Sequence, residues 1–261
     1  MKLNAVYILI TIVITSCLLS GCSKLRAVEN TTPSVDTAAI PTVLSQADTA
    51  FKQREDLSKL RNAIAELATV RDPDNRNFEV ERRFAEFNYF LGIHTDDEKE
   101  ASAAFEKGRE AGNIVSKLEP ERPDGYFWYG ANLGELSRKS PITVGLRSVD
   151  DIKEAMNKVI EMQPNFQGGS AFDALAQVEL ATRINGGKAE NAVKYLEKGV
   201  SIEDDNSNLH LHLGEAYLAV NRDKDARVQL EHVLKMTPNP DYLPEHRIAV
   251  EAAKKLLATK F

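Results

Sequence analysis

Seven residues in the segment 207–240 strongly limit how this chain can fold. They stand at three- and four-residue steps in two groups, followed by a proline: Leu213, Gly214, Tyr217, Ala226, Leu230, Val233 and Pro238. Such steps predict two helices joined by a turn. The glycine lets the two helices approach closely, and the alanine stands where they cross. The proline ends the second helix, because it has no N–H to donate.

This pattern matches the signature positions of the tetratricopeptide repeat, a helix–turn–helix unit of roughly 34 residues. Weaker copies run back along the chain, each ending in apolar residues followed by Pro or Asp: Val70–Pro73, Val115–Pro120, Val159–Pro164, Val200–Asp204 and Val233–Pro238. Only the interval between the last two endings has the standard repeat length, so the earlier units need longer helices or inserted loops. The sequence therefore predicts an all-α helix-hairpin solenoid of about five units.

The helices can be placed from these endings, and no stretch alternates at period two for long enough to predict a strand. Two degenerate units are expected at Val43–Asp72 and at Phe78–Leu118, the second with a break at Gly92–Thr95. The later hairpins and a C-terminal capping helix are expected at Tyr126–Leu136 with Val149–Met162, Ala171–Arg183 with Ala189–Ile202, and Pro244–Lys260. The segment Ser137–Ser148 is an insertion between two helices.

The N-terminus predicts export and lipidation. An apolar run, Ala5–Leu19, follows Lys2 and is shorter than the roughly 20 residues of a membrane-spanning helix, so it fits a secretory signal. The next residues, Leu19-Ser20-Gly21-Cys22, resemble the lipobox of bacterial lipoproteins, in which the signal is cut before an acylated cysteine. An ordinary signal with a chance cysteine is the alternative. We expect a signal peptide at 1–21, a lipidated flexible tether at 22–42 and a helical-repeat domain at 43–261.

Charge and cysteine content narrow the partners further. Loss of Lys2 with the signal leaves 32 basic against 39 acidic residues, a net charge near −7. The mature chain has no basic stripe, which argues against nucleic acid as a partner. Because Cys17 is removed and Cys22 carries lipid, we expect neither disulfides nor a cysteine metal site. In similar lipoproteins a serine such as Ser23 after the lipidated cysteine favours the periplasmic face of the outer membrane.

The sequence offers little that indicates catalysis. Four histidines lie near one another, His210, His212, His232 and His246, but His210 and His212 stand at i, i+2, which places them on different sides of a helix. A zinc site is the alternative to packed or surface histidines. No phosphate-binding loop or HExxH motif occurs. We expect no enzymatic activity, no metal and no cofactor, although paired acidic residues leave a carboxylate enzyme as an alternative.

The aromatic run Tyr126–Tyr129 is the best candidate for binding. If Phe127 packs in the core, Trp128 projects into the inner groove, and groove spacing extends this line over three units: Trp128, Asn132, Glu135, Asp173, Gln177, Leu211 and Glu215. An exposed tryptophan among polar groups is typical of an interaction hot spot. The alternative is that the insertion Ser137–Ser148 buries Trp128.

With these residues in view, the chain resembles the T-component (TatT) family of lipoproteins that accompany TRAP-type transporters. The likeness covers Phe78–Pro238 and rests on Gly125–Gly134, on Gln163–Phe166 with Gly168-Gly169, and on Gly186-Gly187 before Ala192 and Leu196. The resemblance implies helical-repeat assemblies, sometimes trimeric, with a central pore. It also implies docking of the soluble solute-binding protein, which carries a hydrophobic or organic-acid ligand.

Three functions follow as hypotheses. The first is a lipid-anchored periplasmic scaffold that docks a solute-binding protein. The second is a lipoprotein that supports envelope assembly. The third is a carrier that holds an apolar small molecule in its groove or pore.

Overall fold

The computed structural model describes residues 36–139 and 145–261. Within this part of the chain every regular element is a helix and there is no strand, which confirms the all-α prediction. Cys22, the signal peptide and most of the expected tether lie outside the described residues, as does part of the insertion Ser137–Ser148. Residues 35–261 form a compact unit of their own.

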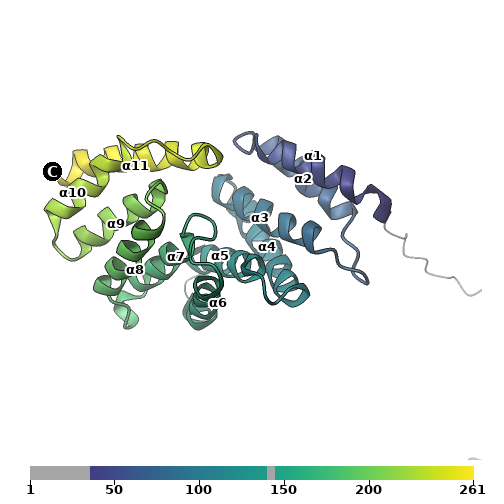
Figure 1. Ribbon diagram of the computed structural model, residues 1–261, viewed down its shortest axis with the longest axis horizontal. Helices are drawn as coiled ribbons and strands as arrows, with labels where there is room; N and C mark the ends of the chain where they lie inside the picture. The colour runs from purple at the N-terminus through teal and green to yellow at the C-terminus, as the bar shows by residue number, and fades with distance from the viewer. Residues whose placement is uncertain (1–35, 140–144) are drawn as a thin grey trace, which may run out of the picture. The chain divides into compact units, whose positions relative to one another are not determined.

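Figure 1 shows the helices in chain order. Their bounds are α1 Ile40–Phe51, α2 Leu57–Thr69, α3 Phe78–His94, α4 Glu98–Leu118, α5 Pro123–Lys139, α6 Val149–Met162, α7 Ser170–Ala181, α8 Ala189–Ile202, α9 Ser207–Ala219, α10 Asp223–Val233 and α11 Leu243–Lys260. Consecutive helices pack in pairs, α1 with α2 and so on to α9 with α10, while α11 packs on both α9 and α10. This arrangement confirms the expected five hairpins and terminal helix.

Helix starts follow local chemistry. The side chains of Asp56, Asn77, Asp97 and Asn206 each accept a hydrogen bond from a backbone N–H of the first turn, which satisfies donors that a helix leaves unpaired. α1 begins at Ile40, three residues before the expected start at Val43, because Pro41 fits the first turn of a helix. The loop before α7 ends with Gly169 at a φ of 72°, a left-handed conformation that glycine adopts readily.

Glycines also set how closely the hairpins pack. A Cβ at Gly125 of α5 would collide with the Ser116 backbone of α4, and a Cβ at Gly112 would collide with the Tyr129 backbone. In the last hairpin a Cβ at Gly214 would lie 2.9 Å from Cγ of Leu230 and 3.4 Å from the carbonyl oxygen of Ala226. Helices α9 and α10 are therefore in close contact at Gly214 and Ala226, where the sequence predicts that they cross.

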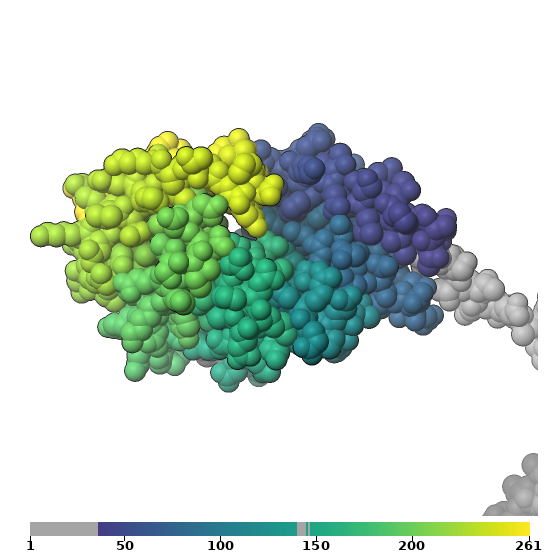
Figure 2. All heavy atoms as spheres, viewed as in Figure 1, coloured from purple at the N-terminus to yellow at the C-terminus, as the bar shows by residue number. Residues whose placement is uncertain are grey.

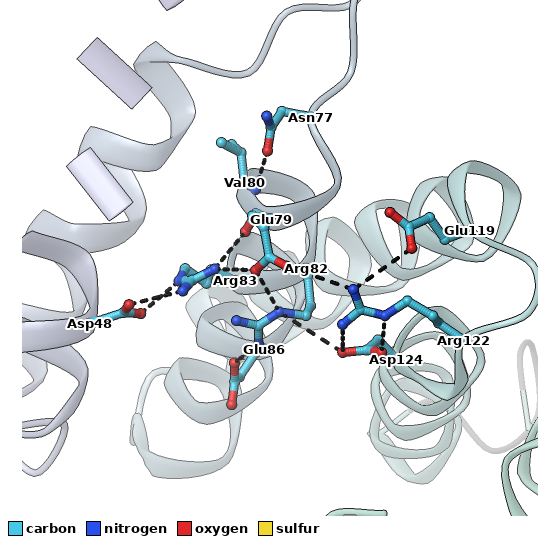
Figure 3. Close-up of polar contacts among 10 residues, drawn as sticks. All are labelled: Asp48, Asn77, Glu79, Val80, Arg82, Arg83, Glu86, Glu119, Arg122 and Asp124. Atoms are coloured by element: carbon cyan, nitrogen blue, oxygen red, sulfur yellow. Dashed lines mark hydrogen bonds and ion pairs between the residues drawn. The ribbon is translucent and has the colours of Figure 1, made fainter. Parts of the chain in front are cut away.

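Ion pairs join the first three hairpins. Figure 3 shows Arg83 of α3 between Asp48 of α1, at 2.6 Å, and Glu79, at 2.5 Å. In the same network Arg122 donates to Asp124 of α5 at 3.2 Å. Burial opposes the charge of Glu79, but the hydrogen bond from Arg83 and its neighbouring charge hold the pKa of Glu79 below its usual range. These charges are paired within the fold, so we assign them to packing of the hairpins.

A second ion-pair cluster closes the loop before α3. Glu81 is completely buried, and its carboxylate accepts hydrogen bonds from Arg71 at 2.7 Å and from Arg76 at 2.8 Å. Both arginines come from the connection between α2 and α3. The pair of arginines thus supplies the charge that a buried carboxylate requires.

Candidate functional site

The described body contains a cavity of about 960 Å³. Its walls come from α3, α5, α6 and α7 and from the start of α9, and residues 238–246 border it on one side. In Figure 2 the body is hollowed beneath the yellow C-terminal helix, where that helix faces the teal and green middle helices. The hollow is thus enclosed by successive repeats on one side and by the C-terminal segment on the other.

One wall of the cavity is aromatic. The Trp128 ring lies 4.9 Å from Phe127, 5.7 Å from Tyr89 and 6.2 Å from Phe90, measured between centroids. All four residues border the cavity, and Met156 of α6 lies beside them. This wall arises because α3 and α5 each carry large apolar side chains on the face that they turn toward each other.

Charged groups that border the cavity are already paired. His212 Nδ1 of α9 lies 2.7 Å from Asp173 Oδ1 of α7, and Arg138 lies 3.1 Å from Glu135, both on α5. Burial opposes the charge of His212, yet the adjacent Asp173 carboxylate raises the pKa of His212 to about 9. Burial also raises the pKa of Glu135 above its usual range.

The C-terminal segment closes the cavity through polar contacts. The Tyr242 hydroxyl donates to Gln167 Oε1 at 3.2 Å, and His246 Nδ1 lies 2.6 Å from Ser207 Oγ. Beside the cavity Arg54, from the turn between α1 and α2, forms an ion pair with Glu245 of α11 at 2.8 Å. Burial lowers the pKa of His246, so this histidine is neutral at physiological pH.

The expected groove line divides into two groups in the structure. Glu135, Asp173 and Gln177 border the cavity together, as their spacing required. Asn132 instead lies in the core with no exposed surface, where its Nδ2 donates to the carbonyl oxygens of Trp128 and Ala85. Because Asn132 follows Trp128 by four residues, both side chains lie on the same face of α5, which is turned toward α3.

The other misplacement concerns α9. Leu211 is 6% exposed and packs with Leu230 and Ala249 beneath α11, and Glu215 is half-buried. His212, one position later, borders the cavity, together with Ser207 and Asn208 at the start of α9. The predicted line was therefore shifted by one residue in this unit. Asp173, which pairs with His212, belongs to the predicted line. The pair itself could not be predicted from local sequence, because its two residues lie 39 positions apart.

Trp128 is buried rather than exposed, with 1% of its surface accessible. The rings of Tyr89, Phe90 and Phe127 pack around Trp128, which borders the cavity as one residue of the aromatic wall. The expected exposure of Trp128 in the groove is therefore wrong, and the rings that pack on it come from α3 and α5, whereas part of the insertion Ser137–Ser148 lies outside the described residues. It also removes Trp128 from the candidates for direct contact with a protein partner.

The other residues singled out in the sequence have packing contacts. His210 is buried, with its Nδ1 2.7 Å from Gln229 Oε1 and its ring 4.3 Å from that of His232. The Tyr217 hydroxyl donates to Glu197 at 2.8 Å, and Ala226 is buried. In the described residues no group of three His, Cys, Asp or Glu side chains is placed to hold a metal ion. Nor does any helix in that part of the chain have the length and apolar character to cross a bilayer.

Comparison with known proteins supports the repeat fold. Residues 186–243 match the tetratricopeptide-repeat family model, and residues 43–168 match a model described as regulator of microtubule dynamics protein 1-3. No curated protein matches the chain. A solved structure of TTC0263, a thermophilic TPR protein of Thermus thermophilus, is similar over 83% of this chain and 98% of its own, with 17% identity and a TM-score of 0.59.

A second similar structure is MamA AMB-1, which is 15% identical over 85% of this chain and 95% of its own, with a TM-score of 0.42. The repeat-model match and the TTC0263 structure support the tetratricopeptide superfamily for this chain. Proteins with this fold are in general non-enzymatic scaffolds for protein interactions.

Proposed function

We propose that this chain, a helical-repeat protein of the tetratricopeptide superfamily, is a non-enzymatic scaffold at the periplasmic face of the outer membrane. Lipid on Cys22 anchors it, and the repeats dock the soluble solute-binding protein of a TRAP-type transporter. The repeat fold supports the general role of interaction scaffold. The lipobox-like residues before Cys22 and the resemblance of Phe78–Pro238 to the T-component family motivate the anchor and the partner.

The observation that carries the docking surface is the placement of polar side chains from successive hairpins around one cavity. Glu135 and Arg138 from α5 and Gln177 from α7 border it together. The Arg138 side chain is 64% exposed, so it is open to a partner that covers this edge. We therefore place the partner over these polar residues, at the edge formed by α5 and α7. Trp128 is buried and is not accessible to another protein.

Site-directed cross-linking tests the partner. A photo-reactive amino acid replaces Arg138 in the full chain, and the matched control carries it at Lys107, which is exposed on α4 and does not border the cavity. Illumination of intact cells followed by mass spectrometry should identify a solute-binding protein at position 138 and not at position 107. A different class of protein at position 138, or the same yield at both positions, would contradict the proposed docking.

Cell fractionation tests the anchor separately. Cys22→Ser should abolish lipidation and remove the protein from the outer-membrane fraction, whereas Cys17→Ser should leave fractionation unchanged because that cysteine is removed with the signal. Outer-membrane fractionation of a mature-sized Cys22→Ser protein would show that the anchor is wrong.

A further inference from the structure

A glycine in the interior of a helix borders the cavity at a position where no neighbouring atom requires the absence of a side chain. Gly134 lies in α5, and a Cβ built on it has no atom within 4 Å. Gly130, one turn earlier, is different, since its Cβ would lie 2.7 Å from Cε of Met156. Glycine is among the least favourable residues inside a helix. At position 134 its effect on the structure is to keep volume free on the cavity side of α5.

The charges around the cavity are neutralised within the protein. Asp173 is paired with His212, Glu135 with Arg138 and Glu245 with Arg54, as described above, and Asp205 is exposed at the edge. An anionic ligand would leave water without an unpaired positive charge in the lining to receive it, and burial of an unpaired charge is strongly unfavourable. The walls therefore select against anions.

The size and the aromatic wall of the cavity define the rest of the ligand. Small-molecule sites typically enclose roughly 300–1,000 Å³ and combine apolar walls with a few polar groups. This cavity, at about 960 Å³, has that composition, since its lining combines the rings of Tyr89, Phe90 and Phe127 with the polar side chains of Gln177 and His212. We propose that the cavity is a binding site for an uncharged, mostly apolar small molecule that lies against the aromatic wall. This site does not depend on the identity of the protein partner.

The experiment uses two probes that share one ring system. N-phenyl-1-naphthylamine is uncharged, and 8-anilino-1-naphthalenesulfonate adds a sulfonate to it. Fluorescence titration of residues 35–261, which form a compact unit, avoids the detergent that a lipidated chain requires. The uncharged probe should bind one site per chain, with a dissociation constant at least tenfold lower than that of the sulfonate. Equal affinities, or no binding of the uncharged probe, would overturn the proposal.

A cavity-filling variant locates the probe. Gly134→Leu places a side chain in the cavity, and Ala103→Leu adds the same side chain at an exposed position of α4 that does not border it. Gly134→Leu should weaken binding of the uncharged probe at least tenfold, about 1.4 kcal/mol. Ala103→Leu should bind as wild type. Circular dichroism and thermal melting check that both variants fold, and an unchanged affinity in a folded Gly134→Leu protein would exclude the cavity as the site.

Discussion

Arg54 and Glu245, at opposite ends of the described chain, form a bidentate ion pair. Nε of Arg54 lies 2.9 Å from Oε1 of Glu245, and Nη2 lies 2.8 Å from Oε2. The same guanidinium donates to the carbonyl oxygen of Asp241 and lies over the ring of Phe51. Because both side chains are largely buried, this pair joins the first hairpin to α11 beside the cavity.

Breaking this pair should release the start of α11. Arg54→Met keeps an apolar chain over Phe51 but leaves Glu245 without its partner, which typically costs on the order of 3 kcal/mol when the charge is buried. Urea unfolding should show this loss, and amide hydrogen exchange should rise at residues 241–248.

The matched control is Arg247→Met. Arg247 pairs with Glu55 between the same two segments, but both side chains are about 60% exposed. Exposed pairs contribute roughly 1 kcal/mol or less. Equal losses in Arg54→Met and Arg247→Met would show that burial of the Arg54 pair does not matter.

Overpacking should destabilise the last hairpin. At Gly214 an added side chain meets Leu230, and Ala226 has no exposed surface. Gly214→Leu or Ala226→Leu should each cost ~1–3 kcal/mol and lower the melting temperature. Gly134→Ala is the control, since its Cβ meets nothing and alanine is favoured over glycine by ~1 kcal/mol inside a helix. A Gly214→Leu protein that melts like wild type would contradict the helix crossing described here.

The pair of His212 and Asp173 should make stability depend on pH above neutrality. The pKa of His212 is about 9 in the folded chain and about 6.5 in an unfolded one. Its contribution is therefore complete below about pH 6.5 and is lost as the pH rises through about 9. The charged groups that face His212 are Asp173, Glu215, Arg138 and Glu135.

Urea unfolding at pH 6, 7.5 and 9.5 measures this contribution as wild type minus His212→Gln. The difference should fall by on the order of 3 kcal/mol between pH 6 and pH 9.5. In an Asp173→Asn background the His212→Gln difference should lose most of its pH dependence. A wild-type difference that stays constant across this range would rule out a raised pKa of His212.

The buried carboxylate of Glu81 should be the most sensitive charge in the first half of the chain. Glu81→Gln keeps the side-chain volume but leaves Arg71 and Arg76 without a counter-charge, and we expect a loss of about 3 kcal/mol. Glu106→Gln removes an exposed pair with Arg109 and should cost roughly 1 kcal/mol or less. Chemical unfolding of the two variants compares them directly, and similar losses would contradict the role of burial.

Helix positions were predictable because helical period, caps and breakers act over a few residues. The helices Val149–Met162 and Ala189–Ile202 have the bounds that the sequence predicts. The expected tether, 22–42, overlaps the start of α1 at Ile40, because a proline such as Pro41 is compatible with both a loop and the first turn of a helix. Gly169 and Gly186 adopt left-handed conformations in the turns between helices.

Lipidation of Cys22 remains a prediction from the sequence. For the helical body, the local pattern determined an all-α chain of paired helices with close contact at Gly214 and Ala226. Only the tertiary structure decided that Trp128 and Asn132 face α3, that His212 takes the place expected for Leu211, and that Arg54 meets Glu245. The physical reason is that a one-residue change in phase turns a side chain by about 100° on a helix. Burial then depends on packing between helices that are distant in the sequence.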